Sequence, residues 1–103
     1  MSDTVRWSSY EFTVYPHDGT QWHNVAGIYI FAGLNQANQW VALYIGQCDS
    51  FADRIPSHER WAEAVQLGAT RVHAMVVPQA ANRDRIEQEL VRTFQPRLNT
   101  QLR

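Results

Sequence analysis

Two apolar segments with strand-like composition enclose one polar loop near the middle of the chain. Residues 28–31 read Ile-Tyr-Ile-Phe, residues 40–45 read Trp-Val-Ala-Leu-Tyr-Ile, and residues 33–39 between them are rich in asparagine and glutamine. Aromatic and β-branched residues favour strands, and a short polar connection that contains glycine favours an antiparallel hairpin. We therefore expect this hairpin to lie at the centre of a β-sheet.

The flanking segments alternate between strand and helix patterns. In chain order we expect a half-buried strand over residues 10–15, helical residues 49–68 interrupted at Pro56, a strand over residues 70–77, and a helix from an Asn82 cap to about Phe94. Ser57 is expected to cap the helical part after Pro56, and Gly68 to end it. This order predicts one small α+β domain, with a central, mainly antiparallel three-stranded sheet flanked by helices and an extra N-terminal strand.

The composition argues against membrane insertion and secretion. No apolar run approaches the roughly 20 residues that a membrane-spanning helix needs. The first residues, Met-Ser-Asp-Thr-Val-Arg-Trp, show no signal-peptide pattern. The lone Cys48 cannot form an internal disulfide. We expect a cytoplasmic protein without membrane contact.

Basic residues are concentrated in the second half of the chain. Residues 1–53 carry one basic side chain against five acidic ones, whereas residues 54–103 carry eight against five, and all nine basic residues are arginines. The planar arginine fork suits bidentate contact with phosphate. The pattern is compatible with a nucleic-acid partner, and a GC-rich genome would explain the arginines equally well.

Two tyrosines are expected to project from the same face of the central hairpin. Side chains alternate between faces along a strand. If Ile28 and Ile30 face the core together with Val41, Leu43 and Ile45, then Tyr29 and Tyr44 share the opposite, open face. Gly27, Ala42 and Gly46 would leave room beside the rings for a substrate backbone. Alternatively, the two rings simply pack under a helix.

The last predicted helix singles out one carboxylate. At 100° per residue, Ile86, Leu90, Val91 and Phe94 form one apolar stripe, and Glu87 falls inside it while Glu89 falls off its edge. A carboxylate on a core-facing stripe is costly unless it is paired or binds a cation. Glu87 is therefore a candidate metal ligand, with a salt bridge to Arg54 or Arg83 as the alternative.

The tripeptides Gly27-Ile28-Tyr29 and Tyr44-Ile45-Gly46 resemble the two signatures of the GIY-YIG endonuclease family. They occur in the order and on the adjacent strands that this family requires. The family also carries an arginine on the following helix, often with a histidine or tyrosine four residues later, and here Arg54 is followed by His58. Without the resemblance, Arg54 would be taken as a surface residue and His58 as an exposed or helix-capping one.

The resemblance extends to the C-terminal part of the chain. In the family a metal-binding glutamate precedes a terminal P-x-x-N, as Glu87 precedes Pro96-Arg97-Leu98-Asn99. A nuclease domain is thus expected over residues 27–99, with residues 1–26 as an N-terminal extension of the same domain and residues 100–103 as a tail. One departure is Gln47, which stands where many members have lysine.

The resemblance implies a catalytic set of Tyr29, Tyr44, Arg54, His58 and Glu87. Glu87 would hold one Mg²⁺, which Mn²⁺ could replace. Tyr44 would act as general base or proton relay, Tyr29 would orient the water or the phosphate, and Arg54 would stabilise the phosphoryl transition state. Gly27, Gly46, Gln47 and Asn99 would contact the substrate. Arg54, His58 and the cation are expected to lower the pKa of the tyrosine base, so that activity rises between pH 7 and 9.

The expected activity is hydrolysis of DNA. The chain shows no helix-turn-helix, zinc finger or other appended reader, so a long specific site is not expected from this domain alone. Single-stranded DNA is the preferred substrate because the modest positive charge fits a flexible single strand at least as well as a long duplex footprint. The alternatives are a nuclease for branched or damaged duplex DNA that is directed by a partner protein, and a non-catalytic nucleic-acid-binding module. The four tryptophans could stack on unpaired bases or fill the core. The predicted N-terminal strand, taken as a sheet edge, could dock a partner protein or a second copy.

Overall fold

Within residues 3–100, which are the residues that the computed structural model describes, the chain forms five strands and four helices. In chain order these are β1 (Thr4–Trp7), β2 (Tyr10–Tyr15), β3 (Gly27–Leu34), β4 (Trp40–Cys48), α1 (Phe51–Arg54), α2 (Glu59–Gln66), β5 (Arg71–Val76), α3 (Ala80–Phe94) and α4 (Arg97–Thr100). The predicted C-terminal tail lies outside the described residues from residue 101 onward.

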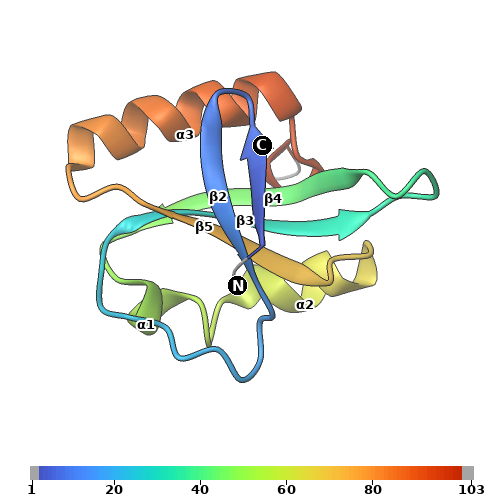
Figure 1. Ribbon diagram of the computed structural model, residues 1–103, viewed down its shortest axis with the longest axis horizontal. Coiled ribbons are helices and arrows are strands. Elements are labelled where there is room, and N and C mark those ends of the chain that lie inside the picture. Colours follow the sequence, from blue (N-terminus) through green and yellow to red (C-terminus); the bar gives the residue numbers. More distant parts are fainter. Residues whose placement is uncertain (1–2, 101–103) are drawn as a thin grey trace.

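The five strands form one antiparallel sheet in the order β1-β2-β5-β3-β4 (Figure 1). The predicted α+β fold with a mainly antiparallel sheet is confirmed, but the sheet has five strands, whereas three central strands and one extra N-terminal strand were expected. The prediction missed β1 because four residues are too few for alternation to be recognised. A tight turn, in which Ser8 has a φ of 57°, returns β1 onto β2.

The N-terminal strand is not a sheet edge, contrary to expectation. Thr13, Val14 and Tyr15 of β2 pair with β5, while the other side of β2 pairs with β1. The edges of the sheet are β1 and β4. A protein contact or homodimer through this region stays a prediction, and β1 is the strand that would offer it a free edge.

Helices cover both faces of the sheet, so that β3 is buried on both sides. In Figure 1, α3 lies above the sheet and α1 and α2 lie below it. On the α3 side, Ile28, Ile30 and Ile45 pack with Ile86 and Leu90. On the other side the core contains a second set of residues, which includes Tyr29, Phe31, Phe51, Ile55 and Leu98. The predicted open face beside the tyrosines is therefore covered by α1 and α2.

A β-bulge in β4 changes the predicted alternation. Phe31 pairs with Tyr44 but Ala32 pairs with Ala42, so that Leu43 has no partner of its own. Leu43 and Tyr44 both pack on the side of α1 and α2, whereas Ala42 packs with Ile45 on the α3 side. The predicted shared face of Tyr29 and Tyr44 is confirmed, but Leu43 and Ala42 were assigned to the wrong faces.

Two predicted helix caps are wrong. The cap of α2 is His58 instead of Ser57, and its ring accepts a hydrogen bond from the Arg60 backbone N–H. The helix α3 begins at Ala80 after the cap residue Gln79, which leaves Asn82 inside the first turn. Gly68, with a φ of 109°, follows the end of α2 as predicted. In the described part of the chain, no helix is long and apolar enough to cross a membrane.

His73 of β5 is a fully buried histidine on the α3 side of the sheet, and its place in the core agrees with a structural role. The Trp7 indole donates a hydrogen bond of 2.9 Å to its Nδ1, so the neutral ring carries its proton on Nε2. Burial lowers the pKa of His73 to about 4. The imidazolium form is thus disfavoured in the folded chain.

We expect the protein to lose stability as the pH falls from about 6.5 to about 4. Over this pH range a histidine in the unfolded chain binds a proton, whereas His73 in the folded chain stays neutral. The free energy of unfolding therefore falls by about 1.4 kcal/mol per pH unit for each such group. His58, whose pKa is also lowered to about 4, adds a second proton. Urea unfolding at each pH measures this slope. His73→Gln should reduce the slope of the unfolding free energy against pH by the equivalent of about one proton. His23→Gln, at an exposed site, serves as the control. An unchanged slope in His73→Gln would contradict the assignment.

Candidate active site

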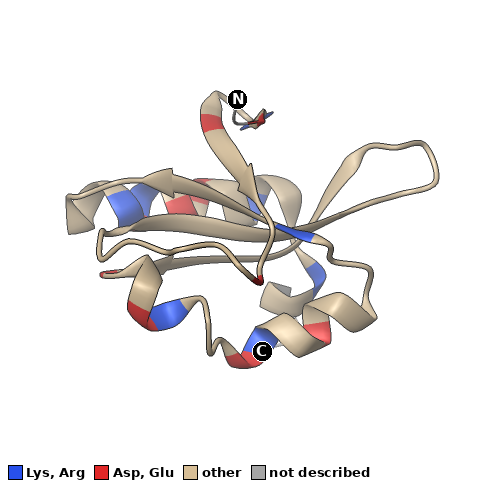
Figure 2. Cartoon of the chain, turned by 60° about the horizontal axis from the view of Figure 1, so that its bottom comes forward, with Lys and Arg blue, Asp and Glu red and all other residues tan. Residues whose placement is uncertain are grey.

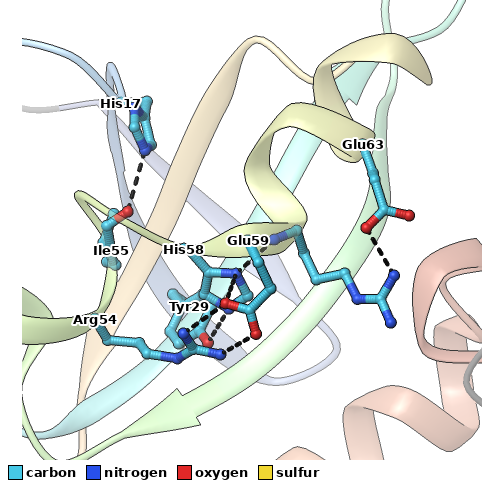
Figure 3. A network of polar contacts seen from close by, with 8 residues as sticks. His17, Tyr29, Arg54, Ile55, His58, Glu59 and Glu63 are labelled. Atoms are coloured by element: carbon cyan, nitrogen blue, oxygen red, sulfur yellow. Dashed lines mark hydrogen bonds and ion pairs between the residues drawn. The ribbon is translucent and has the colours of Figure 1, made fainter.

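Tyr29 and His58 form the buried centre of the site. The Tyr29 hydroxyl lies 2.7 Å from His58 Nε2, and the exposed fractions of the two residues are 1% and 5%. Tyr29 projects from β3, and His58 caps α2 across the α1–α2 turn. Figure 3 shows both side chains within one network of polar contacts. His58 is thus a helix-capping residue, as in the alternative reading, but it is buried against Tyr29.

The hydrogen bonds of His58 define the direction of the Tyr29 contact. A backbone N–H can only donate, so the Nδ1 atom that accepts from Arg60 carries no proton. Burial and the Arg54 charge lower the pKa of His58 to about 4, so the ring is neutral near pH 7. Its proton lies on Nε2 and is donated to the Tyr29 oxygen. The Tyr29 O–H is left to donate a hydrogen bond to another group.

Arg54, the last residue of α1, is held in a bidentate pair with Glu59. Its Nη1 and Nη2 atoms donate to the two carboxylate oxygens at 2.8 and 3.0 Å (Figure 3). This contact raises the pKa of Arg54, and it lowers the pKa of Glu59 to about 2. The guanidinium is part-exposed, with 39% of its side-chain surface accessible. Sequence reasoning missed Glu59 because Pro56 breaks the helical phase between it and Arg54.

His17 supports the turn that carries Arg54 and His58. Its Nε2 lies 3.1 Å from the Ile55 carbonyl oxygen, and its Nδ1 lies 2.8 Å from the Asp18 carboxylate. The ring thus links the residues around Asp18 to the backbone of the α1–α2 turn. The ring also stacks on Trp61 at 4.3 Å. The N-terminal extension therefore braces the α1–α2 turn, a role with no recognisable sequence signal.

Tyr44 is the more accessible of the two tyrosines. It is half-buried, and its ring centroid lies 6.3 Å from that of Tyr29. Burial raises the pKa of Tyr44, the positive charge of Arg54 opposes this rise, and the negative charge of Glu87 adds to it. Burial also raises the pKa of Tyr29. The Arg54 charge acts in the expected direction, but burial outweighs it, so that in the chain without a bound cation the net shift of the Tyr44 pKa is upward.

Glu87 is half-buried on α3 and pairs with Gln47, not with an arginine. The Gln47 amide donates to Glu87 at 2.8 Å and to Asp84 at 2.7 Å. Burial and the Asp84 charge raise the pKa of Glu87. The alternative salt bridges are absent from the described residues, because Arg54 pairs with Glu59 and Arg83 pairs with Asp49. Asp84, three residues before Glu87, shares its helix face and could have been found from that spacing.

The donor set at Glu87 fits a hard divalent cation. Magnesium prefers oxygen ligands and is commonly held by one or two carboxylates together with water and substrate phosphate. Glu87 and Asp84 converge on a single amide donor, which takes the place that a cation could fill between them. No group of three histidine, cysteine, aspartate or glutamate side chains converges anywhere in residues 3–100. The residues therefore suit an ion that the substrate helps to bind.

The glycines and Asn99 have packing roles in the structure. A Cβ atom on Gly46 would lie 2.6 Å from the Tyr29 hydroxyl, and one on Gly27 would lie 2.4 Å from the Phe51 ring. The space that a Cβ atom would take beside both glycines is thus filled by protein atoms, and contact of Gly27 and Gly46 with the substrate stays a prediction. Asn99 accepts from the Ile45 N–H and donates to the Ile45 carbonyl, both at 2.8 Å. This two-point contact fixes the edge of β4 between Tyr44 and Gly46.

Two hollows lie on either side of α1. The smaller, of about 310 Å³, is a groove between the end of β4 and α1, and Gln47, Cys48, Ser50 and Arg54 are among its lining residues. This groove extends from Gln47, the partner of Glu87, to Arg54. The larger, of about 380 Å³, lies between β2, β5 and the loop over residues 20–25, and Phe51 and Trp22 line it.

Charged residues of both signs are interspersed along the helices instead of forming one basic face (Figure 2). Among the described residues, Arg54, Arg60 and Arg83 are paired with acidic side chains. Three of the eight arginines in residues 3–100 are thus already neutralised by an acidic partner, which weakens the case for a long phosphate footprint. The arrangement suits contact with one or a few phosphates.

The fold belongs to a known structural class. The chain superposes on solved structures of the GIY-YIG N-terminal endonuclease domain of UvrC from Thermotoga maritima. The form bound to its catalytic divalent cation, magnesium, is 21% identical, with a TM-score of 0.60 over 74% of this chain and 84% of that one. A point mutant of the same domain is 22% identical, with a TM-score of 0.58 over 74% and 83%.

No protein-family model matches the chain, and no curated protein matches it in sequence. The structural likeness nevertheless establishes that the chain has the GIY-YIG fold. The resemblance read from the sequence is thereby confirmed at the level of the fold.

Proposed function

We propose that this protein is a cytoplasmic, divalent-metal-dependent DNA endonuclease that prefers single-stranded DNA. The observation that carries the proposal is the groove that joins Arg54 to Gln47, the partner of Glu87, with Tyr44 within electrostatic reach of both charges. The solved structures compared above are endonuclease domains bound to a catalytic divalent cation. Mg²⁺ is the proposed ion, and Mn²⁺ its substitute.

In the proposed hydrolysis, one side chain takes the proton of the attacking water and another stabilises the negative charge on the phosphate. Tyr44, the accessible phenol, in its ionised form takes a proton from the water whose oxygen bonds to phosphorus. The P–O bond to the leaving nucleoside oxygen breaks, and this oxygen takes up a proton from solvent. Arg54 donates to the non-bridging phosphate oxygens as negative charge develops on them. The Tyr29 O–H, fixed by His58, donates to the phosphate or to the water. A divalent cation held by Glu87 and Asp84 would polarise the phosphate and offset the carboxylate charge that raises the pKa of Tyr44.

The larger hollow supports the preference for single strands. Trp22 lines it and lies edge-on to Tyr15, with ring centroids 5.2 Å apart. The Trp22 indole N–H is buried and has no hydrogen-bond partner among residues 3–100. An unpaired base offers an aromatic face that can stack on the accessible part of the Trp22 ring, whereas the faces of a base inside a duplex are already stacked on its neighbours. The hollow and the groove are both lined by α1 and its flanking residues, so that neighbouring nucleotides could occupy them.

The proposal is tested by incubating the protein with labelled single-stranded DNA, duplex, branched DNA and RNA, each with Mg²⁺, Mn²⁺ or EDTA. We expect single-stranded DNA to be cut fastest, with either metal and not with EDTA. Trp22→Ala should weaken binding of single-stranded DNA by about tenfold and leave duplex binding unchanged. Faster cutting of branched DNA would favour a structure-selective nuclease. Binding without cutting under any metal condition would favour a non-catalytic module.

A further inference from the structure

Glu59 offers Arg54 the same chemistry as a substrate phosphate would. Its two carboxylate oxygens lie 2.8 and 3.0 Å from the two terminal nitrogens of the guanidinium. Carboxylate and phosphate are alternative partners for this planar fork, and both can be held by two parallel hydrogen bonds. A phosphate can therefore engage the end of the fork only when Glu59 has left it.

The position of Glu59 is anchored to the centre of the site. It is the first residue of α2 and directly follows His58, which bonds to Tyr29. One carboxylate oxygen lies 3.8 Å from His58 Nδ1, too far for a hydrogen bond, and the neutral ring makes no ion pair with it. The Arg54 fork is thus the main contact that holds the carboxylate, and the Glu59 backbone N–H adds a second one. The contact with the fork directs the guanidinium toward the Tyr29–His58 pair (Figure 3).

The pair is also easy to exchange. The Glu59 side chain is 66% exposed and that of Arg54 is 39% exposed, so water screens the attraction between them. Exposed ion pairs contribute little free energy. An incoming phosphodiester offers two oxygens that share one negative charge, as the carboxylate oxygens of Glu59 do, and can replace them without leaving a buried charge unpaired.

We propose that Glu59 is a positioning residue that holds Arg54 in its working orientation before DNA binds and is displaced by the substrate phosphate. The inference rests on the proposed nuclease function of the site. Glu59 would lower the DNA affinity by competing with phosphate, and it would raise the turnover by keeping the fork aligned. A purely structural role would instead support both binding and turnover.

The test compares Glu59→Gln with Glu63→Gln. Both variants remove one negative charge from α2, but Glu63 pairs with Arg60 instead of Arg54. Binding of a fluorescent single-stranded oligonucleotide is measured in EDTA, and turnover with Mg²⁺. We expect Glu59→Gln to bind about two- to fivefold more tightly than Glu63→Gln and to turn over about tenfold more slowly. In an Arg54→Ala background, the affinity difference between the two variants should vanish.

The outcomes separate the inference from the proposed function. Equal or weaker binding by Glu59→Gln, including no measurable binding by any variant, overturns the role of Glu59. The same holds if the affinity difference survives in the Arg54→Ala background. If the wild-type protein cuts no DNA, the nuclease function fails, while the binding comparison in EDTA still decides whether Glu59 competes with phosphate. Thermal unfolding of each variant checks that all of them fold.

Discussion

Replacing Glu87 by glutamine is expected to reduce metal-dependent DNA cleavage by about a thousandfold, because stabilisation of a phosphoryl transition state by a cation is worth several kcal/mol. The substitution keeps the shape of the side chain and removes the charge that would bind the ion. Fold stability should not fall, since burial already disfavours the charged form of Glu87 and raises its pKa. The measurement is the initial rate of cleavage at saturating Mg²⁺.

Glu89→Gln is the matched control for this variant. Glu89 lies two residues further along α3 and accepts a hydrogen bond from the Tyr10 hydroxyl at 2.7 Å. The Glu89→Gln variant should cut DNA at nearly the wild-type rate. A second readout is the rise in melting temperature that Mg²⁺ with substrate produces, which Glu87→Gln should lose. Normal cleavage by Glu87→Gln together with loss of cleavage by Glu89→Gln would move the metal site to the other carboxylate.

Local periodicity was enough to predict the hairpin, the type of each longer element and the position of Glu87. Helical phase places Glu87 beside Leu90 and Val91, and the structure finds it half-buried on that side of α3. Strand alternation likewise brings Tyr29 and Tyr44 to one side of the sheet. Helical phase and strand alternation gave correct predictions here because they depend only on residues within one helix or strand.

Periodicity within one helix or strand could not predict the contacts between different helices and strands. The bulge at Leu43 depends on how β3 and β4 fit together, and alternation alone assigns Leu43 to the opposite face. The cap at His58 depends on burial of its ring against Tyr29, a residue 29 positions earlier. Glu59 reaches Arg54 across a turn broken by Pro56, so no regular spacing links the two.

The two tyrosines have different hydrogen-bond environments, and this difference supports the proposed assignment of Tyr44 as the base. Tyr29 is buried and already accepts a hydrogen bond from His58, so its hydroxyl is suited to donate. Tyr44 is accessible and lies within electrostatic reach of Arg54 and Glu87. A base must be deprotonated to act, and a phenol with a pKa above 10 is almost fully protonated at neutral pH. As long as the pH stays below that pKa, the ionised fraction of the phenol therefore increases about tenfold for each unit by which the pH is raised.

We accordingly expect cleavage by the wild-type protein to rise by up to about a hundredfold between pH 7 and 9, as long as the chemical step limits the rate. Tyr44→Phe should cut at least a hundredfold more slowly at pH 9 and lose this dependence on pH. Tyr29→Phe should also be slow, because it loses a donor to the phosphate, but it should keep the slope. Single-turnover rates across the pH range measure both effects. If the slope disappears in Tyr29→Phe and persists in Tyr44→Phe, the roles of the two tyrosines are reversed, and a flat wild-type profile would exclude a phenol base altogether.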